Sequence, residues 1–123
     1  MAREAAKKSI RAEVDGLFEQ QVSQLTQAQY LVLLWATQGE GLGVKYNLTN
    51  CFDDLKHAGI TRTKQTAVAV VEAVRSLCFI EIKDERNRKN IYITKWGAQA
   101  LAALVSAGHF QNLESQFLRE AQK

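Results

Sequence analysis

The sequence predicts a mainly α-helical chain with one small β-hairpin (α+β). Residues 79–83 and 90–94 alternate apolar and polar side chains, as half-buried strands do. The residues between them, 84–89, are all polar or charged, which predicts a turn. Apolar side chains recur at helical spacing over 63–77, directly before the first strand. A helix followed by a hairpin with a cationic tip is typical of a winged helix-turn-helix, and such a tip suits contact with DNA phosphate.

Length and composition describe a single folded domain. The chain has 123 residues, 46% of them hydrophobic, which is enough to bury one core. We expect one domain over 1–123, with the winged-helix core at 26–94 and added helices at 3–22 and 95–121. No apolar run approaches the roughly 20 residues of a membrane span, and the N-terminus alternates charge. We therefore expect a cytoplasmic protein without membrane contact.

Two helices are predicted at the start of the chain. The first, 3–22, carries apolar residues at helical spacing: Ile10, Val14, Leu17 and Phe18. The second begins at Thr26, where Thr26 and Gln29 have the form of a capping box. It ends near the glycine-rich stretch 38–43. Because it is apolar on almost all sides, we expect it to be the central buried helix, with Trp35 in the core.

A helix-turn-helix is predicted next. Asn47 or Thr49 is expected to cap its first helix, which Gly59 ends. Thr61 or Thr63 is expected to cap the second, the recognition helix. The predicted inward faces are Leu48, Cys51, Phe52 and Leu55 on the first helix, and Ala67, Val70, Val71, Val74 and Leu77 on the second. Two short helices joined by a tight turn containing glycine make the helix-turn-helix unit.

Two further helices are predicted after the hairpin. Thr94 caps one that Gly108 ends, and a last helix is expected at about 110–121. Their apolar stripes are Ala98, Leu101, Ala102, Leu104 and Val105 on the one, and Phe110, Leu113, Phe117 and Leu118 on the other.

Positive charge gathers in the predicted helix and hairpin. The net charge of the chain is only +3, yet residues 61–95 contain eight basic and four acidic side chains, a local net of +4. The rest of the chain therefore sums to −1. This distribution is the electrostatic footprint expected of a protein that binds a polyanion.

Three stretches resemble the MarR family of bacterial winged helix-turn-helix transcription regulators. They are the opening of the central helix (25–33), the recognition helix with the first strand (66–80), and the exit from the wing, Ile91 to Gly97. With the flanking helices, the resemblance spans nearly the whole chain. The sequence departs from the family pattern at Cys78, where family members usually carry glycine, and in the longer spacing from the charged turn to Thr94.

The resemblance implies a symmetric homodimer in which the first helix and the last two intertwine. The expected interface residues are Ile10, Val14, Leu17, Phe18, Leu104, Phe110, Leu113 and Phe117. Three amphipathic helices outside a small winged core also carry more apolar surface than that core needs. The alternative is that these stripes pack within a monomer. A small-molecule effector is an expectation at the level of the family only.

The predicted DNA contacts divide between the recognition helix and the wing, 83–90. The recognition helix enters the major groove, where the expected base-reading residues are Lys64, Gln65, Thr66, Val68 and Ala69. The wing contacts phosphate or the minor groove. The expected phosphate-contacting residues are Arg62, Thr63, Lys83, Arg86, Arg88, Lys89 and Lys95. The function predicted from the sequence is therefore selective binding of double-stranded DNA, typical of a transcription regulator.

Two other functions stay open. A winged helix also serves as a protein-interaction module, which the small net charge and the apolar Val68 and Ala69 favour. A DNA-binding protein of plasmid or phage replication or partition is the other alternative. Binding to random duplex DNA that depends on salt separates the first alternative from both DNA-binding functions.

The sequence predicts neither an enzyme nor a cofactor or metal site. It has no glycine-rich phosphate loop, and its carboxylates, such as Asp53 and Asp54, are expected to face solvent. Cys51 and Cys78 have no partners at metal-ligand spacing and are expected to be buried reduced thiols, a redox switch being the alternative. Trp96 is expected in the core or at a dimer contact.

Overall fold

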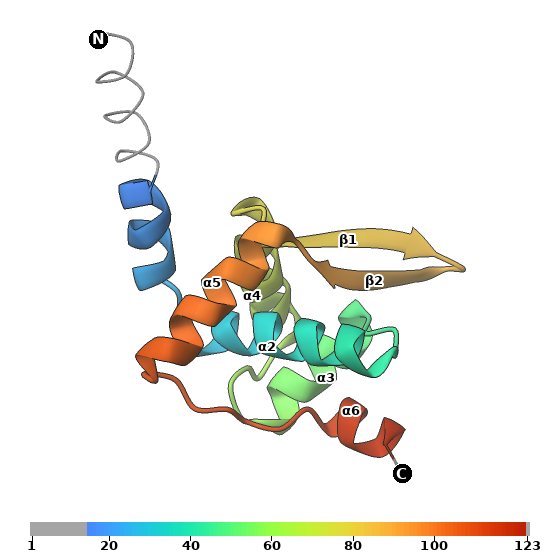
Figure 1. Cartoon of the computed structure of the whole chain (residues 1–123). Helices are drawn as coiled ribbons and strands as arrows, with labels where there is room; N and C mark the ends of the chain where they lie inside the picture. Colours follow the sequence, from blue (N-terminus) through green and yellow to red (C-terminus); the bar gives the residue numbers. More distant parts are fainter. Residues whose placement is uncertain (1–14, 123) are drawn as a thin grey trace, which may run out of the picture.

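A computed structural model describes residues 15–122 of the chain. A helical segment at 15–23 leads into α2 (Figure 1). The labelled elements then follow in the order α2 (Gln27–Leu42), α3 (Leu48–His57), α4 (Lys64–Ser76), β1 (Ile80–Glu85), β2 (Arg88–Ile93), α5 (Lys95–Ala107) and α6 (Gln116–Ala121). Within the described residues, no helix combines the length and apolar character needed to span a membrane.

Helix α2 is the centre of the fold, as predicted. Its N-terminus carries the complete capping box of Thr26 and Gln29, and its residues 30–36 are all buried. The helix passes through the glycine-rich stretch and ends at Gly43, whose φ of 71° is left-handed. Helices α3, α4 and α5 and strand β2 all contact α2, so both the helix-turn-helix and the wing are anchored on it.

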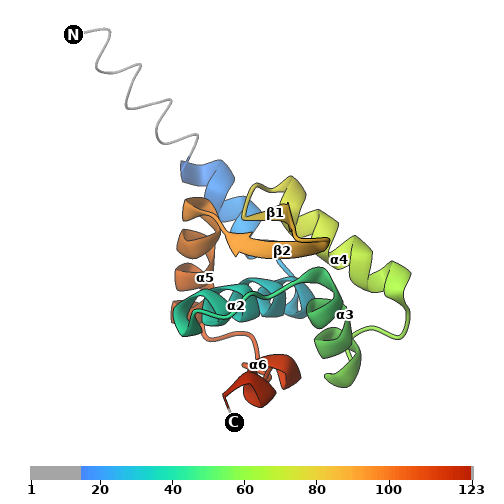
Figure 2. The same ribbon diagram turned by 90° about the vertical axis from the view of Figure 1, so that its right-hand side faces the viewer.

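Helices α3 and α4 form the helix-turn-helix (Figure 2). The side chain of Asn47 caps α3 by accepting the N–H of Asn50, and Thr63 caps α4 by accepting the N–H of Thr66. Gly59 lies in the turn with a φ of 76°, a conformation that a residue with a Cβ rarely adopts. The buried side chains of α4 are Ala67, Val71 and Val74.

The wing is an antiparallel hairpin whose strands are longer than predicted. Ile80 pairs with Ile93 at its base, and Glu85 pairs with Arg88 next to the turn. The expected turn over 84–89 was therefore wrong, because only Arg86 and Asn87 separate the strands. These two residues have φ values of 51° and 67°, the left-handed pair that a tight two-residue hairpin turn requires.

Helix α5 begins and ends where the sequence predicts, with Thr94 as its N-cap and Gly108 as its C-cap. It starts in close contact with the base of the wing. A Cβ added at Gly97 would lie 1.9 Å from the carbonyl oxygen of Phe79, so only glycine fits at this crossing.

The last predicted helix, 110–121, was largely wrong. Only α6, with six residues, is helical there, and residues 109–115 form an extended segment that we name the C-terminal strap (Figure 1). The strap binds α2 through its backbone. The side-chain amide of Gln27 both donates to and accepts from the backbone of Gln111, each at 2.8 Å, and the indole N–H of Trp35 donates to the carbonyl of Leu113 at 2.9 Å. These bonds replace those that a helix would make within itself.

The solvent-facing position expected for Asp54 was also wrong, because this side chain is only 2% exposed. Its carboxylate accepts hydrogen bonds from the Tyr46 hydroxyl at 2.6 Å, the Phe117 N–H at 3.1 Å and the Ser115 hydroxyl. Three donors satisfy a carboxylate that would otherwise be costly to bury. Asp54 therefore joins α3 to the end of the strap and the start of α6.

Candidate nucleic-acid interface

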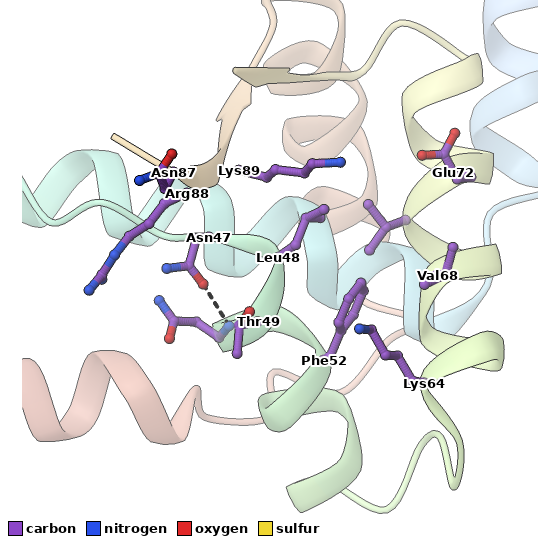
Figure 3. Close-up of a pocket in the computed structure, with 12 residues that line it drawn as sticks. Asn47, Leu48, Thr49, Phe52, Lys64, Val68, Glu72, Asn87, Arg88 and Lys89 are labelled. Atoms are coloured by element: carbon purple, nitrogen blue, oxygen red, sulfur yellow. Dashed lines mark hydrogen bonds between the residues drawn. The ribbon is translucent and has the colours of Figure 1, made fainter. Parts of the chain in front are cut away.

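A groove of about 690 Å³ separates the helix-turn-helix from the wing (Figure 3). Helix α3 supplies its apolar floor with Leu48 and Phe52, and α4 lines it with Lys64 and Val68. From the opposite side, Lys89 of β2 extends toward α4 (Figure 3). The groove thus has an apolar floor and cationic side chains on both walls.

All five predicted base-reading residues are exposed on α4. Lys64, Gln65 and Thr66 occupy its first turn, and Val68 and Ala69 follow. The hydroxyl of Thr66 lies 2.9 Å from that of Thr63, which caps the helix, so both hydroxyls are held beside the backbone. Val68, 39% exposed, gives this surface an apolar spot.

The structure brings together only some of the predicted phosphate contacts. Arg88 and Lys89 line the same groove as Lys64. Arg62 and Thr63 line an adjacent groove of about 250 Å³ beside α3, which shares Phe52 and Lys64 with the first. Lys83 lies midway along β1, paired with Asn90 and 4.0 Å from the carboxylate of Glu81. The remaining predicted contacts, Arg86 and Lys95, are at the wing turn and at the start of α5.

Lys45, which is not among the residues predicted from the sequence, also belongs to this cationic surface. Together with Arg86 and Arg88 it lines a groove of about 760 Å³ on the wing. Its ammonium donates to the hydroxyl of Tyr92 at 2.8 Å, a bond that raises the Lys45 pKa. A single lysine in the loop before α3 forms no pattern, so nothing in the sequence marks it; the pairing of Asn47 with Asn90 brings that loop to β2.

The predicted dimer residues are mostly packed against their own chain. Leu104 is buried, and the residues half-buried against the core are Phe18, Phe110, Leu113 and Phe117. Leu17 is 60% exposed. Ile10 and Val14 lie outside the described residues. Trp96 was expected in the core or at a dimer contact. Its side chain is 51% exposed, with its ring centroid 6.0 Å from that of Phe18, so the core position is wrong and the dimer contact stays a prediction.

The two thiols occupy different environments. Cys51 is buried as expected, and burial, with a contribution from Asp54, raises its pKa to about 12. Cys78 is exposed, so the expectation of a buried thiol was wrong there. Its φ of 63° explains why glycine suits this position. Among residues 15–122, no group of three or more His, Cys, Asp or Glu side chains is arranged to hold a metal ion.

Three solved structures have the same arrangement of elements. Bordetella bronchiseptica BpsR, whose DNA binding is regulated by 6-hydroxynicotinic acid, aligns with 88% of this chain and 74% of its own, at 17% identity and a TM-score of 0.55. A mutant of S. aureus MepR bound to an oligodeoxyribonucleotide covers 86% and 75%, at 21% identity and a TM-score of 0.52. A MarR family transcription regulator covers 87% and 68%, at 15% identity and a TM-score of 0.50.

No protein-family model and no curated protein sequence matches the chain. The likeness to the solved structures spans both the helix-turn-helix and the hairpin that follows it. At these identities it establishes the fold alone: the chain has the winged helix-turn-helix fold of the MarR family of transcription regulators.

Proposed function

We propose that this protein binds double-stranded DNA with sequence selectivity and acts as a transcription regulator. One observation carries the proposal: cationic side chains of α4 and of the wing line the same exposed groove. Lys64 comes from the recognition helix, and Arg88 and Lys89 come from β2. Elements separated in sequence thus offer positive charge on one face, as a surface that follows a phosphate backbone should.

In this proposal α4 enters the major groove and the wing contacts the backbone or the minor groove. Lys64 and Gln65 have the donors to recognise guanine and adenine edges, and Val68 and Ala69 suit a thymine methyl. Five exposed readers per recognition helix, of which Thr66 has its hydroxyl held beside Thr63, are a modest set, so we expect moderate selectivity. The wing cations supply affinity that does not depend on sequence.

A homodimer and a small-molecule effector belong to the same proposal. Two recognition helices related by a twofold axis would read a pseudo-palindromic site, which increases selectivity. The exposed Leu17 and Trp96 lie outside the cationic groove, where a second chain can cover them without blocking DNA. Regulation of BpsR by 6-hydroxynicotinic acid is a precedent for an effector on this fold.

A protein-interaction module is the second candidate. It draws support from the apolar side chains in the groove, Leu48, Phe52 and Val68. Such a surface suits an apolar anchor of a partner protein as well as it suits a thymine methyl.

Fluorescence anisotropy of a labelled random-sequence duplex tests the proposal. We expect binding at low salt that weakens steeply as the salt concentration rises, because each cation that meets a phosphate releases counterions. A duplex pool enriched by repeated selection should then bind more tightly than the random one at the same salt. Absence of binding to random duplex at every salt concentration would reject DNA binding and favour the protein-interaction module.

A further inference from the structure

An acidic residue occupies the most cationic part of the wing. Glu85 is the last residue of β1 and is followed by Arg86, with Arg88 paired opposite it. A carboxylate at this position repels DNA phosphate, so electrostatics alone does not explain an acidic residue in a DNA-binding surface. The hydrogen bonds of Glu85 suggest a structural role for it instead.

Glu85 is the centre of a hydrogen-bonded group that crosses the wing. One carboxylate oxygen accepts from the Tyr92 hydroxyl and from the side-chain amide of Asn90, the latter at 2.9 Å. The hydroxyl of Tyr92 in turn accepts from the ammonium of Lys45, which also lies 5.0 Å from the centre of the Tyr92 ring. The hydrogen bonds from Tyr92 and then from Asn90 lower the pKa of Glu85, which keeps its carboxylate ionised as an acceptor.

This group attaches the wing to the helix-turn-helix. Lys45 belongs to the loop that leads into α3, and the same loop pairs with β2 through Tyr46, whose carbonyl accepts the Ile91 N–H at 2.8 Å. That backbone pairing continues to the buried Asn90. Tyr92 links the two parts, because its hydroxyl accepts from Lys45 of the loop and donates to Glu85 within the wing. The loop before α3 therefore holds the wing at the backbone of β2 and at the Tyr92 hydroxyl, and Glu85 fixes that hydroxyl from the end of β1.

We propose that Glu85 and Tyr92 are positioning residues for DNA binding: they brace the wing so that Arg86 and Arg88 meet the backbone while α4 lies in the major groove. The brace rests on the proposed function for its effect on DNA. It predicts an outcome opposite to that of simple charge, because removal of a negative side chain should weaken DNA binding.

Two neighbouring acids make a matched test. Glu85→Ala and Asp84→Ala remove the same charge from adjacent positions of β1, and Asp84 is exposed, opposite Lys89. By anisotropy with the random duplex, we expect Asp84→Ala to bind at least as tightly as the wild type. Glu85→Ala should bind roughly fivefold more weakly, with a salt slope smaller by about one as one wing cation loses its phosphate.

A second variant keeps every charge. Tyr92→Phe retains the ring under Lys45 and removes only the hydroxyl, and it should also weaken DNA binding. Because both residues act in one group, the double variant should bind no more weakly than Glu85→Ala. If Glu85→Ala binds as tightly as Asp84→Ala, or if Tyr92→Phe binds as the wild type does, the brace is rejected.

Hydrogen exchange separates the brace from the proposed function. The Ile91 amide should exchange faster in Glu85→Ala than in Asp84→Ala or the wild type, because the wing detaches from the loop more often. If the wild type binds no duplex, the proposed function fails and exchange alone decides: faster exchange in Glu85→Ala supports the brace, and equal exchange overturns it.

Discussion

At the residue scale, Gly97 lies where the backbone of α5 approaches the base of the wing too closely for any side chain. Its missing side chain lets α5 begin against the carbonyl of Phe79, which in turn accepts the N–H of Thr94 at 3.1 Å. The Thr94 hydroxyl, which caps α5 by accepting the N–H of Gly97, also donates to the carbonyl of Cys78 at 2.6 Å. The base of the wing and the start of α5 therefore form one rigid junction.

Gly97→Ala should destabilise the protein strongly. A Cβ 1.9 Å from a backbone oxygen forces the junction apart, at a cost of about 3 kcal/mol in the free energy of unfolding. Gly41→Ala is the control, because a Cβ there meets nothing within 4 Å and replaces a helical glycine, which should stabilise by up to about 1 kcal/mol. Denaturant unfolding followed by circular dichroism measures both. Equal stability of the two variants would contradict the claim that only glycine fits at position 97.

The two thiols should differ in reactivity. In the native protein at pH 8, Ellman's reagent should react with one thiol per chain, Cys78, and with two after denaturation. Cys78→Gly, which suits the positive φ, should abolish the native reaction. Two reactive thiols in the native state would place Cys51 in solvent.

The raised pKa of Cys51 also makes the free energy of unfolding fall at high pH. The contribution of the buried thiol to stability is complete below the ordinary pKa of 9.0 and is lost as pH rises toward about 12.

At the element scale, the wing tip should supply affinity without selectivity. Arg86→Ala with Arg88→Ala removes two exposed cations, so binding to every duplex should weaken and the salt slope should fall by about two. Arg119→Ala is the control, because it removes an exposed cation of α6 that is ion-paired with Glu114, outside both α4 and the wing. Anisotropy with random and selected duplexes measures both. An unchanged affinity in the wing variant would remove the wing from the mechanism.

Elements specified by neighbouring residues were predicted well from the sequence. The side chains of Thr26, Asn47, Thr63 and Thr94 each cap a helix by bonding to a backbone N–H three residues later, so the local sequence contains the whole signal. The buried faces of α2 and α4 were predicted correctly for a similar reason, because the helical spacing of apolar residues is also contained in the local sequence.

Elements that depend on distant partners were missed. The C-terminal strap has apolar residues at helical spacing, yet its backbone bonds to Gln27 and Trp35, which lie 84 and 78 residues away in the chain. Asp54 can be buried because it accepts from Tyr46, from Ser115 at the end of that strap and from Phe117 at the start of α6. The outer half of the wing extends beyond the core with its residues 83–89 largely exposed, so its paired strands carry no apolar alternation. The site residues on the wing were therefore found by charge and not by strand pattern.

At the scale of the whole molecule, the proposed dimer accounts for apolar surface away from the DNA face. Sedimentation of the wild type should give twice the mass of one chain. Leu17→Glu, at a side chain that is 60% exposed, should shift the mass toward the monomer, because association would bury its charge unpaired. Leu42→Glu, at the exposed end of α2, is the control and should stay dimeric. If the wild type is monomeric at every concentration, the proposed dimer is contradicted and the apolar stripes of the flanking helices pack within one chain.

The central claim is that one face, formed by α4 and the wing, binds duplex DNA. Hydrogen exchange of the wild type with and without a selected duplex tests it most directly, because it maps protection along the chain. We predict new protection at 63–69 and 83–90, with α6 and the C-terminal strap unchanged. Protection confined to α6 and the strap, or none while the duplex is bound, would contradict the account.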